Sequence, residues 1–374
     1  MDNRSCLACG AAAGAIFALA CAILTSAGPL DPPAGAVSPT HKTLTEIEPR
    51  TAINATDTAG DADSVFKITQ PGSYYLTGNL TGVSGKHGIE VAAGDVFIDL
   101  CGFRMVGNAS STSLNGIHAI SQVRNVSVRN GTVTGWGGIG VNLASGASVS
   151  DDNGLVENMH ASSNGDQGIR VGGNSVVVNC TAAQNGSDGF SAGYSSLIER
   201  CHSANNGGDG FSAGSDSTIL DCVSTRNDGY GFDVSTGCIV DRCNAVGQTL
   251  SGFRSFGSTP GTKFNNCRAS LNLNDGFIFS SSVATGCIAY SNTEAGFRVT
   301  AAGSRVDECT AGANGTGFAS SVANSIYTRN TARGNTTNYD IVAGNSVAPL
   351  VNVTGSNNWG AIPNADSPWA NFGY

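Results

Sequence analysis

The chain has 374 residues, and 51 of them are glycine, about twice the roughly 7% share of an average protein. Charged residues make up only 13%, which excludes a helical bundle or coiled coil, while 40% hydrophobic residues exclude intrinsic disorder. A formal charge of -9 without a lysine or arginine cluster excludes nucleic acid as a partner, and it disfavours uronic-acid polymers unless a local basic groove binds them.

The N-terminal region has the pattern of a secretory signal peptide over residues 1–27. Arg4 precedes a small apolar run from Ala11 to Leu24, and small residues lead up to Ala27. This run is shorter than the ~20 residues of a membrane-spanning helix, so we expect no transmembrane segment. The alternative is a lipid anchor at Cys21. Residues 28–44 form a proline-rich, flexible leader. We therefore expect a secreted or cell-envelope protein.

Residues 45–79 are expected to form an N-terminal cap. The segments Thr45–Ile53 and Phe66–Leu76 carry aromatic residues and a Pro-Gly turn. Such segments suit a seal over the apolar end of a repeat structure.

An internal repeat of about 21 residues extends from residue 80 to residue 345. Its mark is a glycine followed by a phenylalanine, at Phe190, Phe211, Phe232, Phe253, Phe277, Phe297 and Phe318. Less regular copies bring the series to about twelve units, at Ile89, Ile117, Ile139, Ile169 and Ile341. A cysteine precedes most of these positions by nine or ten residues, at Cys180, Cys201, Cys222, Cys243, Cys267, Cys287 and Cys309. An asparagine stands between the two, at Asn164, Asn185, Asn206, Asn227, Asn272 and Asn292.

The residues around these marks alternate between apolar and polar, which predicts about three short strands and three turns in each unit. Asparagine tolerates the left-handed conformation of a tight turn, and its amide can bond to the asparagine of the next unit. A unit of this length cannot bury its own apolar face, so the units must stack into an all-β parallel β-helix. A leucine-rich repeat would need leucine columns, and a propeller blade would need about twice the length.

The units Asn179–Phe190 and Arg200–Phe211 resemble the repeats of right-handed parallel β-helix proteins of the pectin-lyase-like superfamily. The resemblance covers roughly residues 80–345 and implies a single right-handed β-helix. It implies little about activity, because this superfamily includes polysaccharide lyases, glycoside hydrolases, epimerases, phage tailspikes and adhesins.

The cysteines and the C-terminal tail each allow two interpretations. Strand spacing of ~4.8 Å would strain a disulfide between stacked cysteines, so we expect buried free thiols, with one or two disulfides as the alternative and no metal at the thiols. Residues 346–374 contain Trp359, Trp369, Phe372 and Tyr374. They form either an aromatic plug over the last coil or a platform on which a sugar stacks.

Two outward columns of side chains follow from the repeat. The residue after each phenylalanine or isoleucine gives Glu90, His118, Gly140, Arg170, Ser191, Ser212, Asp233, Arg254, Ile278 and Arg298. From this column we select Glu90, His118 and Arg170 as weak candidates for ligand binding. The residue before each cysteine alternates in charge, as at Asp221 and Arg242, and predicts pairing between neighbouring units.

Catalytic residues are less evident. Pectin-type hydrolases are recognised by Asn-Thr-Asp, Asp-Asp, Gly-His-Gly and Arg-Ile-Lys motifs, and Asp151-Asp152 matches only the second. Asp151, Asp152 and Glu157 lie in the longest interval between units and are the weak catalytic candidates. The repeated Asp188, Asp209 and Asp275 either hold tight turns or bind calcium, and no other cofactor is expected.

The sequence favours a non-catalytic scaffold that binds carbohydrate or a cell-surface partner, because the repeat explains most of the polar residues structurally. The alternative is a polysaccharide lyase or glycoside hydrolase.

Overall fold

The computed structural model describes residues 48–108, 114–120, 123–144, 152–257, 261–352, 364 and 366–374. The predicted signal peptide and the leader lie outside these residues. Arg50–Tyr374 form one compact unit, and every element described in it is a β-strand. Across these ranges there is no helix of the length and apolar character that crossing a bilayer requires.

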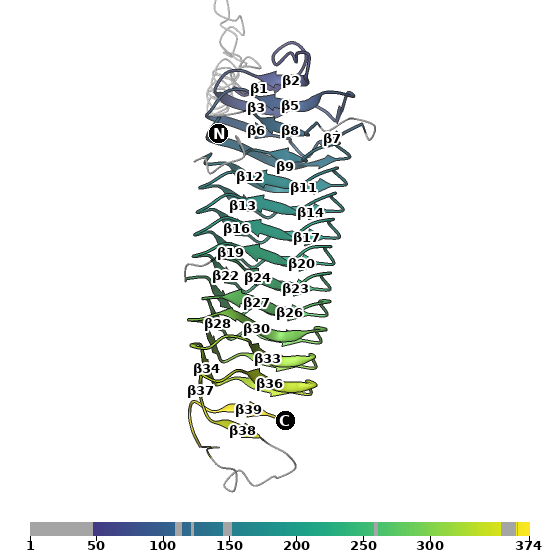
Figure 1. The fold of residues 1–374 in the computed structure, drawn as a ribbon. Coiled ribbons are helices and arrows are strands. Elements are labelled where there is room, and N and C mark those ends of the chain that lie inside the picture. Colours follow the sequence, from purple (N-terminus) through teal and green to yellow (C-terminus); the bar gives the residue numbers. More distant parts are fainter. Residues whose placement is uncertain are drawn as a thin grey trace, which may run out of the picture. The chain divides into compact units, whose positions relative to one another are not determined.

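The strands form a parallel β-helix whose coils stack one on another (Figure 1). One wall is a sheet of thirteen strands. These strands are β2 (Ser64–Ile68), β5 (His87–Val91), β8 (Ile117–Ala119), β10 (Val141–Asn142), β12 (Ile169–Val171), β15 (Phe190–Ala192), β18 (Phe211–Ala213), β21 (Phe232–Val234), β24 (Phe253–Ser255), β27 (Phe277–Ser280), β30 (Ala295–Ala301), β33 (Thr316–Ser320) and β36 (Thr337–Ile341).

The second sheet has 26 strands in two rows. The first row comprises β1 (Thr51–Ile53), β3 (Gly72–Leu76), β6 (Val96–Asp99), β9 (Val126–Thr134), β11 (Leu155–Ser162), β13 (Val176–Val178), β16 (Leu197–Glu199), β19 (Thr218–Leu220), β22 (Ile239–Asp241), β25 (Lys263–Asn265), β28 (Val283–Thr285), β31 (Arg305–Asp307), β34 (Ile326–Thr328) and β37 (Ser346–Val347). The second row comprises β4 (Leu80–Thr81), β7 (Arg104–Val106), β14 (Thr181–Ala183), β17 (His202–Ala204), β20 (Val223–Thr225), β23 (Asn244–Val246), β26 (Arg268–Ser270), β29 (Ile288–Tyr290), β32 (Thr310–Gly312), β35 (Thr331–Arg333), β38 (Leu350–Asn352) and β39 (Asn371–Gly373). β9 and β11 are long enough to belong to both rows.

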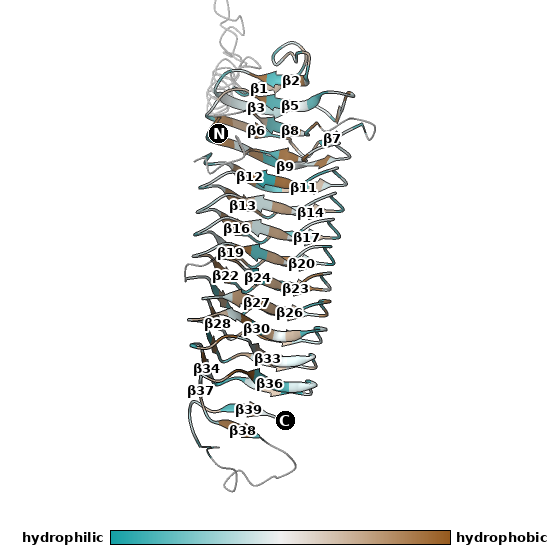
Figure 2. Cartoon of the chain, in the orientation of Figure 1, coloured by the Kyte–Doolittle hydropathy of each residue, from teal (hydrophilic) through white to brown (hydrophobic). Residues whose placement is uncertain are grey.

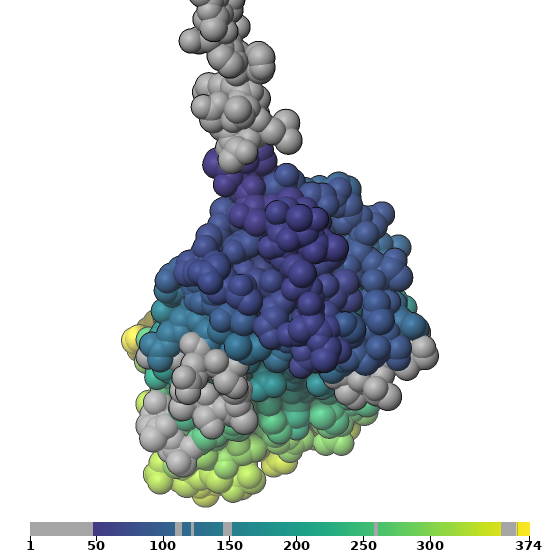
Figure 3. All heavy atoms as spheres, turned by 90° about the horizontal axis from the view of Figure 1, so that it is seen from above, coloured from purple at the N-terminus to yellow at the C-terminus, as the bar shows by residue number. Residues whose placement is uncertain are grey.

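The structure has about 14 coils, close to the twelve that the sequence predicts. The additional coils come from both ends. β2 pairs in register with β5, so residues assigned to a cap already contribute strands to the stack. Viewed down the stack, these first coils, in purple and blue, lie over the later ones (Figure 3). At the other end β39 pairs with β35 and β38.

A column of stacked aromatic rings fills the core behind the thirteen-strand sheet. Rings of successive coils lie nearly parallel, for example Phe211 and Phe232 with centroids 4.8 Å apart. The column ends where Tyr339 stacks on Phe318, so Tyr339 takes the position that the sequence pattern gives to Ile341. The glycine before each phenylalanine is required by space, because a Cβ on Gly189 would lie 2.8 Å from the carbonyl oxygen of Gly210. The predicted Gly-Phe pairs are therefore the positions at which successive coils pack closely against each other.

The asparagines that recur in the repeat form a ladder of hydrogen bonds from coil to coil, as predicted, but their backbone conformation differs from the prediction. Nδ2 of Asn206 donates to Oδ1 of Asn227 at 2.9 Å, and that same oxygen accepts the backbone N–H of Asn206 at 3.0 Å. The prediction that these asparagines adopt the left-handed conformation is wrong. The residue before each of them adopts it instead, as Asn205 does with a φ of 54°. The side chain of the ladder asparagine is thereby directed into the core, where it forms hydrogen bonds with backbone groups at the corner of the coil.

The cysteine ladder is buried and unbridged, as predicted. Nine cysteines are described, all with free thiols, and eight of these are buried. The Sγ of Cys222 accepts the backbone N–H of Cys201 and donates to the carbonyl oxygen of Leu220. Burial raises the pKa of the Cys222 thiol well above its ordinary value. The predicted pairing in the column before the cysteines is also present, with Arg242 Nε 2.7 Å from Asp221.

Candidate functional site

The outward side chains of the thirteen-strand sheet form a continuous polar line. We name as the polar column the outward residues of nine successive strands, which lie beside one another in register: Lys67, Glu90, His118, Asn142, Arg170, Ser191, Ser212, Asp233 and Arg254. Hydrophilic residues on β2, β5, β8 and β12 are visible in Figure 2. The structure therefore brings Glu90, His118 and Arg170 into one line, as predicted.

One member of the predicted column is wrong. Val141, and not Ile139, lies in register with Ile117 and Ile169, so Asn142 takes the outward position assigned to Gly140. The strand β10 has only two residues and contains no phenylalanine. The pair Gly138-Ile139 has the pattern of the repeat without occupying its position, which explains the wrong register. Asn142 would have been found only by matching the valines of this coil to the isoleucines of its neighbours.

Two asparagines hold the ring of His118. Oδ1 of Asn115 accepts the backbone N–H of Ile139 at 2.9 Å, so its Nδ2 is the group that faces Nδ1 of His118 at 3.2 Å. Oδ1 of Asn142 likewise accepts from Ala144, and its Nδ2 lies 3.5 Å from the same ring nitrogen. Because both amides present donors, Nδ1 of His118 accepts, and its proton is on Nε2.

A second imidazole stacks on the first. The rings of His87 and His118 lie 4.3 Å apart at 17°, and Nδ1 of His87 accepts the backbone N–H of Asn115 at 3.0 Å. Burial, together with the neighbouring His87, lowers the pKa of His118 to about 4, and burial also lowers the pKa of His87. Both rings are therefore neutral at pH 7, and each carries its hydrogen on Nε2.

An ion-pair cluster terminates the column at β2 and β5. The ammonium of Lys67 contacts Asp61 at 2.6 Å and Glu90 at 2.7 Å. Oxygens of Asp61, Asp63 and Glu90 lie within 4.8 Å of one another, a spacing that a metal ion could use. The lysine ammonium already supplies the positive charge between Asp61 and Glu90, so we assign no cation to them.

Carboxylates and an arginine occupy the other half of the column. The turn interpretation of Asp188 and Asp209 is confirmed, because Oδ1 of each accepts a backbone N–H of the next coil, from Asp209 at 2.8 Å and from Tyr230 at 2.7 Å. Burial raises the pKa of both, that of Asp209 to about 6 with help from Asp233 and Asp188. Arg254 makes two 2.6 Å bonds to Asp233 and lies 4.0 Å from the ring centroid of Tyr230.

Two of the three predicted catalytic residues, Asp152 and Glu157, are described, and neither is a member of the polar column. Asp151 lies outside the described residues. Asp152 is 2% exposed in the turn before β11, and its carboxylate packs against Gly172. Glu157 lies on β11 in the other sheet, in register with Arg129 and Val178. The long interval between units therefore places Glu157 in the other sheet and not in the polar column.

Two of the C-terminal aromatic residues, Trp369 and Tyr374, are exposed and do not plug the last coil. Trp369 is 52% exposed with its ring 5.2 Å from the guanidinium carbon of Arg329, and Tyr374 is 54% exposed. Trp359 lies outside the described residues. The interior of this end is filled by Val351, Ala370 and Asn371, all at 2% exposure or less.

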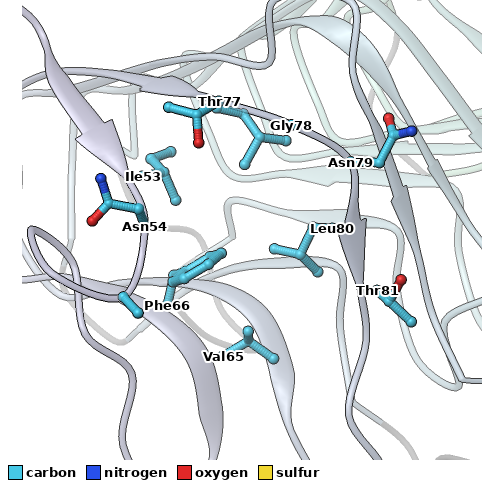
Figure 4. Close-up of a pocket in the computed structure, with 11 residues that line it drawn as sticks. Ile53, Asn54, Val65, Phe66, Thr77, Gly78, Asn79, Leu80 and Thr81 are labelled. Carbon is cyan, nitrogen blue, oxygen red and sulfur yellow. The ribbon is translucent and has the colours of Figure 1, made fainter.

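A pocket of about 260 Å³ lies at the first coils. Figure 4 shows Ile53, Phe66 and Leu80 lining it. Its remaining lining includes Asn54, Asn79 and further small or apolar residues. Because it is lined mainly by the apolar end of the core, we assign no chemistry to it.

Comparison with known proteins supports the fold. Residues 115–269 match the family model described as right-handed beta helix region. This match agrees with the stacked parallel coils of the structure, so the fold is a right-handed parallel β-helix. No curated protein matches it.

Several solved structures are similar to this chain. The A-module of mannuronan C-5 epimerase AlgE6 from Azotobacter vinelandii is 16% identical with a TM-score of 0.49, over 80% of this chain and 88% of that one. The Dettilon tailspike protein is 14% identical with a TM-score of 0.42, over 77% and 60%. A mutant of the periplasmic alginate epimerase AlgG is 11% identical with a TM-score of 0.42, over 86% and 80%. At such identities the likeness concerns the fold alone.

Proposed function

We propose that this protein is an exported, non-catalytic scaffold that binds carbohydrate along the polar column. The observation that carries the proposal is the fixed set of neutral hydrogen-bonding groups around His118. Asn115 and Asn142 orient its ring, and both amides are themselves held by backbone N–H groups. Export rests on the signal-peptide pattern of residues 1–27.

Sugar hydroxyl groups both donate and accept hydrogen bonds, so the imidazole of His118 and the hydroxyls of Ser191 and Ser212 suit them, while the buried amides of Asn115 and Asn142 orient the imidazole. Side chains that are oriented before binding lose little conformational entropy when the ligand arrives. Ser191 and Ser212 follow Arg170 in the column, and their small side chains leave room for a chain lying along the sheet. The line of strands therefore offers an extended polymer one contact at each coil.

The histidine geometry also favours binding over proton transfer. A general base must offer a free lone pair to the substrate. Nδ1 of His118 accepts from two amides, and Nε2 carries the hydrogen. The lysine of the same region, Lys67, is bound between two carboxylates. These groups are thus fixed as donors and ion pairs.

A panel of polysaccharides, screened by mobility of the purified protein in polysaccharide-containing gels, tests the proposal. We expect retardation by at least one polymer, and loss of it in His118→Ala and Asn142→Ala. His202→Ala and Asn244→Ala are matched controls, because these residues face outward from β17 and β23 of the other sheet. Retardation that all four variants retain would place binding elsewhere.

A second candidate function is hydrolysis of a glycosidic bond, favoured by Asp188 and Asp209. They precede adjacent strands, β15 and β18, and the pKa of Asp209 is raised to about 6, near that of a general acid. Reducing-end release from the same panel, abolished by Asp209→Asn, would support hydrolysis. Binding without release of reducing ends supports the scaffold.

A further inference from the structure

We infer that the glycan bound by the polar column is uncharged and is not a polyuronate. This inference rests on the proposed function and concerns the same site. It follows from the way the charged side chains beside the column are paired.

The cations of this sheet face are mostly neutralised within the protein. Lys67 is bound to Asp61 and Glu90. Arg254 is bound to Asp233, and its guanidinium also lies against the ring of Tyr230. Further along the sheet, Arg298 contacts Asp275 at 2.9 Å and Glu294 at 3.2 Å. A carboxylate of a ligand would have to displace a protein carboxylate in order to reach any of these three groups.

The middle of the column is acidic. Asp188 and Asp209 lie beside Ser191 and Ser212, and each uses one oxygen to accept a backbone N–H. Among the described residues, no lysine or arginine lies within ion-pair distance of either carboxylate, whereas Asp233 and Asp275 on the same face are each paired with an arginine. Asp166 and Asp233 act on Asp188 as repelling charges, and Asp233 and Asp188 act in the same way on Asp209, where Arg254 offsets part of the repulsion. Arg170 is the one cation of the column on this stretch.

A polyuronate that followed the column would place its own carboxylates against this acidic stretch. Two like charges in contact repel even in water, and more strongly where the site is partly buried. An uncharged polymer meets no such repulsion, and His118, Asn142, Ser191 and Ser212 themselves carry no charge at pH 7. An uncharged polymer meets hydrogen-bonding groups along the same path.

The test uses one polymer in two charge states. A neutral polysaccharide that binds in the panel is oxidised at its primary hydroxyl groups, which become carboxylates, and both forms are titrated against the protein at low ionic strength. We expect the oxidised form to bind roughly tenfold more weakly or worse. High salt should restore part of the affinity, because screening weakens repulsion between accessible charges.

Oxidation both adds charge to the polymer and removes its primary hydroxyl groups. The double variant Asp188→Asn/Asp209→Asn distinguishes these two effects. Its amides keep an oxygen that can accept the backbone N–H groups, so the turns are retained. The oxidised polymer should bind this variant more tightly than it binds the wild type, and the neutral form should bind both alike. Tighter binding of the oxidised polymer, or of natural polyuronates, to the wild type would overturn the inference while the proposed function stands. If no polymer of either kind binds, the proposed function fails and the inference fails with it.

Discussion

Nδ2 of Asn115 donates to Nδ1 of His118 across 3.2 Å, while Oδ1 of the same amide accepts the backbone N–H of Ile139. The backbone of one coil therefore sets the orientation of an amide, and the amide sets the hydrogen position on an imidazole of another coil. An exposed histidine would exchange its hydrogen between the two nitrogens. His118 is held as a donor through Nε2.

His118 should make stability fall in mild acid. Its pKa is lowered to about 4, so the unfolded chain takes up a proton below about pH 6.5 while the folded chain does so only near pH 4. The contribution is complete above pH 6.5 and is lost as the pH falls towards 4. Urea unfolding at pH 7, 5.5 and 4.5 should show a smaller loss for His118→Gln than for the wild type.

The raised pKa values of Asp188 and Asp209 act in the opposite direction over part of this range, so the difference between variant and wild type is the quantity to compare. His202→Gln serves as the control, because His202 is an exposed side chain on β17. Parallel pH profiles for wild type and His118→Gln would contradict the described geometry of His118.

Asn206 should be among the most costly polar residues to replace. It is 1% exposed, its Oδ1 accepts the backbone N–H of Asn185, and its Nδ2 bonds to Ala182 and Asn227. Asn206→Ala leaves buried donors and acceptors unpaired, at about 1–3 kcal/mol for each such group. Chemical denaturation should therefore show a loss of several kcal/mol. Asn205→Gly, at the exposed left-handed position beside it, should change stability little. Equal effects of the two changes would show that the ladder bond is not what stabilises the corner.

The thiols should differ sharply in accessibility. Cys101 is exposed, whereas the other eight described cysteines are buried in the free form. In protein that lacks residues 1–27, a thiol reagent should modify one cysteine in the native state and nine after denaturation without reductant. Cys101→Ser should abolish the native reaction. Fewer than eight thiols in the denatured variant would reveal disulfides in the ladder.

The coil could be predicted from the sequence because one period governs phenylalanine, cysteine and asparagine together. Where the three residues do not recur together, the predicted register is wrong. Gly-Ile at 138–139 imitated the mark, while the register is set by Val141 pairing with Ile117 and Ile169. The sequence does not reveal that residues 64–68 form a strand of the stack, because no glycine precedes Phe66, although β2 pairs in register with β5.

For the candidate site, the sequence predicts only the side of the sheet on which the residues lie. Alternation places Glu90, His118 and Arg170 on the outside of one sheet, and the structure confirms that placement. It does not reveal that Asn115 and His87 contact the ring of His118, because neither is at the outward position of the repeat. Nor does loop length identify a site, since the long interval holds Asp152 buried against Gly172.

The central claim is that carbohydrate lies along the polar column, and a steric block tests it most directly. Ser191 and Thr181 belong to one coil and both face outward, from β15 and β14 in different sheets. Isothermal titration with a polymer that binds in the panel should show at least tenfold weaker binding by Ser191→Trp and nearly unchanged binding by Thr181→Trp, with similar unfolding free energies. Retained affinity in Ser191→Trp, together with lost affinity in Thr181→Trp, would contradict the account.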